Sequence, residues 1–101
     1  MLSVRPSVCV PAELQELIPR FLAHRRTDVA ALDIAIARSD FEAARKIGHS
    51  LKGVGGGYGF DEISRVGTEI ERAAREGRSE ALRDLACSFV DYLDMVEIRF
   101  D

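Results

Sequence analysis

The sequence lacks any long run of apolar residues. No stretch of about 18 consecutive apolar side chains occurs among its 101 residues, so it predicts no membrane-spanning helix. The first ten residues, MLSVRPSVCV, contain one arginine and no long apolar segment, which is unlike a signal peptide. We therefore expect a protein of the reducing cytoplasm that does not bind membranes.

Cysteine is scarce. The two cysteines, Cys9 and Cys87, are far apart and form neither a C-x-x-C motif nor a metal-ligand spacing. We expect both to be free and to act as small apolar side chains. No Glu-x-x-His pair is present to build a carboxylate-bridged metal centre in a helical bundle. The sequence therefore predicts no metal site and no cofactor of its own.

Charge of one sign is also not abundant. The net charge is −3, from 14 lysines and arginines against 17 aspartates and glutamates. A mildly acidic chain is a poor candidate for nucleic-acid binding, which depends on lysine and arginine at phosphates. The partner that we expect is another protein. The length and the hydrophobic content of 47% suit one domain with one core.

Apolar residues recur with a helical period from Pro11 onward. Pro19 lies inside the first apolar stripe and removes a helical hydrogen bond, so we predict one bent helix or two abutting helices over residues 12–38. Residues 1–10 show no helical period, and we expect them to be extended. The stripe itself consists of Leu14, Leu17, Ile18, Phe21, Leu22, Val29, Leu32, Ala35 and Ile36.

Three further helices follow. Ser39 and Glu42 form a capping-box pattern that predicts the start of the second helix, which then runs into a glycine-rich segment. We expect the third helix over residues 60–76, with Gly77 at its C-terminal end. Ser79 is expected to cap the fourth helix.

The predicted fold is all-α. Amphipathic helices with short connections favour an antiparallel up-down-up-down four-helix bundle, here with an extended N-terminal segment and a bent or split first helix. No strand alternation appears after residue 10. We divide the chain into the extended segment 1–10 and a single domain over residues 11–101.

His49 is the candidate site residue. The core face of the second helix passes through Ile47, Gly48 and Leu51, so His49 points away from the core. Its outward neighbours lie one turn away, with one glycine a further turn along: Arg45, Lys46, Lys52, Gly53 and Gly56.

This outer face has a chemical interpretation. A neutral, exposed imidazole is a nucleophile. A phosphoryl group on its Nε2 atom would need a cation nearby, and Lys52 is one turn away. It would also need room for a partner's active site, and Gly53 and Gly56 have no Cβ to obstruct it. Taken singly, these features suit a solvated histidine, a glycine loop or a solubilising basic face, but together they favour a functional site.

Residues 49–53, HSLKG, resemble the His-x-x-Lys-Gly signature of histidine-containing phosphotransfer domains in two-component phosphorelays. The family pattern continues with Gly59, ten residues after the histidine, and with the Ile70-Glu71 pair. The similarity extends over residues 12–98. One departure is Gly48, where alanine is common in the family, although both residues are small.

The resemblance implies a role for each motif residue. His49 would be phosphorylated, Lys52 would stabilise the phosphoryl group, and Gly53 would keep the site open. The remaining outward residues are candidates for the binding surface, namely Arg45, Lys46 and Gly56.

The resemblance also implies what the protein does and with which partners. A carrier, rather than an enzyme, would accept the phosphoryl group from a receiver-domain aspartate and pass it to a second receiver. We expect a monomer, because a monomer would suffice for this role. Response regulators and hybrid histidine kinases contain such receivers, and they supply Mg²⁺ and most of the catalytic groups.

Two other functions remain open at this stage. The same fold could dock on a receiver or a histidine kinase and regulate it without passing phosphate. The presence of both His49 and Lys52 argues against this alternative, because a regulator without phosphotransfer chemistry does not need them. A plain helical adaptor is the other alternative, and no residue pattern favours it.

Overall fold

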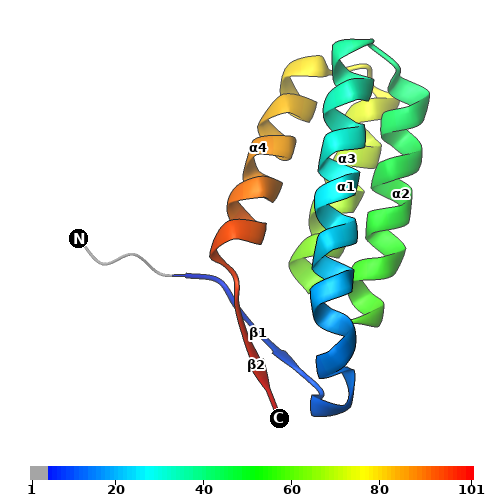
Figure 1. Cartoon of the computed structure of the whole chain (residues 1–101). Helices are drawn as coiled ribbons and strands as arrows, with labels where there is room; N and C mark the ends of the chain where they lie inside the picture. Colours follow the sequence, from blue (N-terminus) through cyan, green and yellow to red (C-terminus); the bar gives the residue numbers. More distant parts are fainter. Residues whose placement is uncertain (1–4) are drawn as a thin grey trace.

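Four helices lie side by side and form a bundle in the computed structural model, which describes residues 5–101 (Figure 1). Each helix contacts the next along the chain, and the first also contacts the last, so the four enclose one core. This arrangement confirms the predicted four-helix bundle. The helices are α1 (Ile18–Ala37), α2 (Phe41–Gly57), α3 (Asp61–Arg75) and α4 (Ser79–Met95).

The first helical stretch is split, as the position of Pro19 predicted. A 3₁₀ helix, η1 (Ala12–Leu17), comes first, and α1 begins at Ile18. Pro19 therefore lies in the first turn of α1, where its missing N–H has no helical partner to lose. The split confirms the alternative of two abutting helices.

The start of α2 differs from the predicted capping box. Asp40, not Ser39, is the N-cap, and its carboxylate accepts a hydrogen bond of 3.0 Å from the backbone N–H of Ala43. Ser39 has a φ of 52°, in the left-handed region, and forms the preceding turn. Glu42 pairs with Arg45 instead of returning to the helix start.

The other predicted helix ends are partly right. Gly77 follows α3 with a φ of 65°, which confirms it as the residue that ends this helix. Ser79 is the first residue of α4 rather than its cap, because Arg78 occupies the N-cap position without a side-chain hydrogen bond. Helix α2 continues through the glycine-rich segment to Gly57.

A short two-stranded ribbon joins the two ends of the described chain. Strand β1 (Ser7–Val10) pairs in parallel with β2 (Glu97–Phe100), and the ribbon extends away from the lower end of α4 in Figure 1. The expectation of no strand after residue 10 is wrong for β2. Four residues carry too little alternation to reveal a strand, and the partner of β2 lies at the other end of the sequence.

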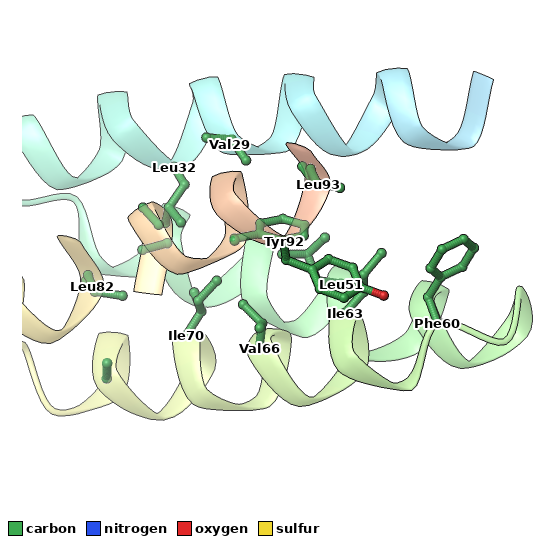
Figure 2. Packing of buried hydrophobic residues seen from close by; sticks show 14 of the residues in the cluster. Val29, Leu32, Leu51, Phe60, Ile63, Val66, Ile70, Leu82, Tyr92 and Leu93 are labelled. Atoms are coloured by element: carbon green, nitrogen blue, oxygen red, sulfur yellow. The ribbon is translucent and has the colours of Figure 1, made fainter. Parts of the chain in front are cut away.

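The core is filled by aliphatic and aromatic side chains from all four helices (Figure 2). Leu32 from α1 and Leu51 from α2 are almost completely buried. The other large, fully buried side chains come mostly from α3 (Ile63, Val66 and Ile70) and α4 (Leu82 and Phe89). Phe60, just before α3, and Val10 of β1 complete the set.

Helices α2 and α3 approach each other along a glycine seam, formed by Gly48, Gly55 and Gly67. A Cβ at Gly48 would lie 2.6 Å from the backbone nitrogen of Glu71, and one at Gly55 would lie 2.7 Å from that of Ser64. A Cβ at Gly67 would likewise meet the carbonyl oxygen of Gly48 at 2.7 Å. The seam therefore lets the two backbones come closer than any larger residue would allow.

Candidate functional site

His49 lies on the outer face of α2. Its side chain is 69% exposed, whereas Leu51, two residues further along, is buried in the core. Its Nδ1 atom is 3.1 Å from Oε2 of Glu71 on α3. The imidazole is therefore held at its inner nitrogen, while the rest of the ring faces solvent.

Glu71 is a buried carboxylate at the centre of the site. Its side chain is 5% exposed, and besides His49 it contacts two cations. Nη2 of Arg75 lies 3.2 Å from its Oε2 atom, and Nζ of Lys52 lies 3.7 Å from its Oε1 atom. Three side chains from two helices thus converge on one carboxylate.

Glu71 and Arg75 belong to the site but were not among the predicted site residues. The signal that could have identified Glu71 is its position, four residues after Gly67 and three before Ala74 in the apolar stripe of α3. A charged residue at a core position needs a partner, because burying an unpaired charge is costly. The identity of that partner depends on the approach of α2 across the glycine seam.

The surrounding charges keep Glu71 ionised. Burial raises the pKa of Glu71, but the hydrogen bond to His49 and the positive charges of Arg75 and Lys52 together hold this pKa below its usual value. An ionised carboxylate only accepts hydrogen bonds, so Nδ1 of His49 must carry the hydrogen and donate it. In the neutral ring, the exposed Nε2 atom then has a free lone pair.

The two other motif residues lie beside this ring. Lys52 is half-exposed, and its ammonium group is close enough to Glu71 for an ion pair but too distant for a hydrogen bond. A Cβ built on Gly53 meets no atom within 4 Å, so the surface above Gly53 is open. Gly56 is less open, because its Cβ would be in van der Waals contact with Oγ of Ser64 at 3.6 Å.

The basic residues on the N-terminal side of His49 are placed differently. Arg45 donates hydrogen bonds of 3.0 and 2.7 Å to the carboxylate of Glu42, so its charge is already paired along α2. Lys46 is exposed. Neither residue joins the set of side chains that meets at Glu71.

The side chain of His49 is mostly exposed to solvent rather than enclosed. A pocket of about 690 Å³ opens elsewhere, between β1, the start of α3 and the last turns of α4, and His49, Lys52 and Gly53 do not line it. A small substrate would find few contacts around His49, because ligand sites are usually concave. The geometry suits a reaction partner that brings its own active site to an exposed nucleophile.

Residues 5–101 contain neither a metal-binding cluster nor a membrane-spanning helix. Within that range, no group of three or more histidine, cysteine or acidic side chains is arranged to hold a metal ion. No helix there has the length and apolar character needed to span a bilayer. Cys9 and Cys87 are both free thiols.

Comparison with known proteins gives one match. The family model described as Hpt domain matches residues 16–97, which include all four helices and the whole site. Neither the curated proteins nor the solved structures provide a match. Members of the matching family are phosphocarriers that transfer phosphoryl groups through a histidine in two-component signalling and interact with receiver domains. Because the match covers most of the chain, this protein belongs to the Hpt domain family.

Proposed function

We propose that this protein carries a phosphoryl group on Nε2 of His49, accepting it from the aspartate of one receiver domain and passing it to the aspartate of another. The observation that carries the proposal is the contact of 3.1 Å between Nδ1 of His49 and the buried Glu71 carboxylate. This contact assigns the ring hydrogen to Nδ1 and leaves a lone pair on the outward nitrogen.

The transfer step balances as a simple displacement at phosphorus. The lone pair of Nε2 attacks the phosphorus atom of the partner's phosphoaspartate, an N–P bond forms, and the P–O bond breaks with its electron pair left on the aspartate carboxylate. The ring keeps its hydrogen on Nδ1 and gains positive charge during the attack. The Glu71 carboxylate faces that charge and stabilises it.

Lys52 and Gly53 serve the phosphoryl group in different ways. Lys52 follows His49 by three residues, so its ammonium group lies on the same side of α2 and offers charge to the phosphoryl oxygens. Gly53 leaves open space above the helix, through which the partner's active site reaches Nε2. The exposed Lys46 adds positive charge to the docking surface, and Gly56 extends the open strip toward the end of α2.

The remaining requirements fall on the partner. The phosphoryl group on its aspartate needs Mg²⁺ to offset negative charge, and we assign that ion to the receiver domain. The protein therefore acts as a carrier, with no cofactor of its own and no catalytic centre independent of the partner. We place the exchange in the cytoplasm and expect a monomer, because one copy of the site contains all the proposed groups.

A labelling experiment tests this function. The protein is incubated with a phosphorylated receiver, and ³¹P NMR of the product identifies the nitrogen that carries phosphorus. We expect phosphohistidine at Nε2 in the wild-type protein and no label in His49→Gln. Label that persists in His49→Gln overturns the assignment. Receiver binding without any transfer would instead indicate a regulator that docks on receivers and passes no phosphate.

A further inference from the structure

The three groups around Glu71 are not equivalent. Oε2 receives both close contacts, from His49 at 3.1 Å and from Arg75 at 3.2 Å. Oε1 has a looser contact with Lys52, at 3.7 Å. Hydrogen bonds to a carboxylate from a cation are shorter than this, so Lys52 is the cation held least firmly.

The helices that carry the two cations explain the difference. Arg75 follows Glu71 by four residues on α3, so a fixed helical spacing holds the two side chains together. Lys52 belongs to α2 and follows His49 by three residues. The position of Arg75 is therefore tied to the carboxylate, and the position of Lys52 is tied to the imidazole.

Phosphorylation of His49 would change the balance of charge around Lys52. The phosphoryl group adds up to about two negative charges beyond Nε2, against the single charge of Glu71. Lys52 is drawn to the larger charge, but its departure would leave a buried carboxylate with one cation fewer. The positive charge that the ring gains beside Glu71 offsets part of this loss, and a cation that stays at Glu71 when Lys52 leaves offsets the rest, because an uncompensated buried charge is strongly unfavourable.

We propose that Arg75 is the permanent counter-ion of Glu71 and so releases Lys52 to the phosphoryl group on His49. The inference rests on the proposed function and adds a positioning residue to it. Arg75 contacts neither Nε2 nor the phosphoryl group in this arrangement. It acts through Glu71, by keeping that carboxylate paired in both the free and the phosphorylated protein.

The chain offers a matched control for removing this charge. Arg72 lies on the same helix, and its side chain is 63% exposed, against 62% for Arg75. Arg72 pairs with Glu69 instead of Glu71. Arg75→Gln and Arg72→Gln therefore remove the same charge from equally exposed positions of α3, and only the first change reaches the site.

The experiment follows Lys52 directly. Phosphoramidate, a small donor that phosphorylates imidazoles without a docking partner, loads His49, and ¹⁵N NMR records the ammonium signal of Lys52 before and after loading. We expect this signal to shift on loading in the wild-type protein and in Arg72→Gln, and to shift less than half as far in Arg75→Gln. Loading of Arg75→Gln should be slower by about tenfold, because the cation that stabilises the developing charge is retained at Glu71. Arg75→Lys, which keeps the positive charge, should restore most of the Lys52 signal shift and most of the loading rate.

The outcomes separate this inference from the proposed function. A wild-type protein that is not loaded at His49 refutes the function itself. Normal loading with equal behaviour of Arg75→Gln and Arg72→Gln refutes only the role of Arg75. A second measurement uses the wild-type protein alone, so it does not depend on whether a variant folds. Loading should move the Lys52 signal and leave the Arg75 guanidinium signal in place. Movement of the Arg75 signal with a stationary Lys52 signal overturns the proposal.

Discussion

His49 on α2 and Glu71 on α3 meet across the helix interface, with 3.1 Å between Nδ1 and Oε2. One residue is mostly exposed and the other is almost completely buried. The contact therefore connects the outer surface of the bundle to its interior. It orients a side chain that would otherwise rotate freely in solvent, and the predictions below follow from it and from the glycines around it.

The first prediction concerns the charge of Glu71. Glu71→Gln keeps the size of the side chain and can still accept a hydrogen bond from His49, but it no longer stabilises positive charge on the ring. We expect phosphoryl transfer from a receiver to slow by about tenfold or more, since the hydrogen bond loses its ionic character. Stopped-flow or quench-flow transfer rates measure the effect. Glu69→Gln on the same helix is the control, and an equal rate in the two variants would contradict the role given to Glu71.

The open surface above Gly53 gives the second prediction. Gly53→Leu places a large side chain where a partner must approach, so transfer should slow by about tenfold or more while the helix itself gains up to about 1 kcal/mol from the better helix former. Gly57→Leu is the matched control, because a Cβ at Gly57 also meets no atom within 4 Å. Transfer rates and urea unfolding are measured on both. Normal transfer by a well-folded Gly53→Leu would remove the clearance argument.

The glycine seam gives the third prediction, about stability. Gly48→Ala inserts a methyl group 2.6 Å from the backbone nitrogen of Glu71 and 2.8 Å from the carbonyl oxygen of Gly67, so the two helices must separate. We expect a loss of about 1–3 kcal/mol, typical of overpacking. Gly53→Ala, with open space around it, should instead stabilise the protein. Equal unfolding free energies for the two variants would show that the seam is not a tight contact.

The fourth prediction is the acid dependence of stability. The pKa of Glu71 is lower in the folded protein than in the unfolded chain, so this carboxylate stabilises the fold above the unfolded pKa, and the contribution disappears as the pH falls through the folded pKa. Urea unfolding at neutral and at acid pH should therefore show a larger loss for the wild-type protein than for Glu71→Gln. Comparing these two proteins cancels the contribution of other acidic residues. Identical losses would show that folding does not lower the pKa of Glu71.

Much of the bundle could be predicted because its signals are local. The helical period of apolar residues, the break at Pro19 and the turn at Gly77 each depend on a few neighbouring residues. The outward direction of His49 follows from the same period. These features could be predicted without knowing which helices pack against each other.

The missed features depend on contacts between distant segments or on the choice between adjacent residues. Glu71 reaches His49 only because α2 and α3 pack closely, and strand β2 exists only in combination with β1. At the start of α2, Ser39 and Asp40 are both good capping residues. The turn places Ser39 in the left-handed region, so Asp40 instead accepts the capping hydrogen bond from the backbone N–H of Ala43.

The parallel ribbon has a consequence for the order of folding. Ser7 pairs with Glu97 and Val10 with Phe100, so the ribbon closes a loop that contains nearly the entire chain. Closing such a loop has a large entropic cost unless the helices have already brought its ends together. Residues 41–75 form a local helix pair that contains His49 and Glu71, and this pair can form before the two strands meet. The ribbon is then the last element to form, and its local opening would leave the contact between His49 and Glu71 in place.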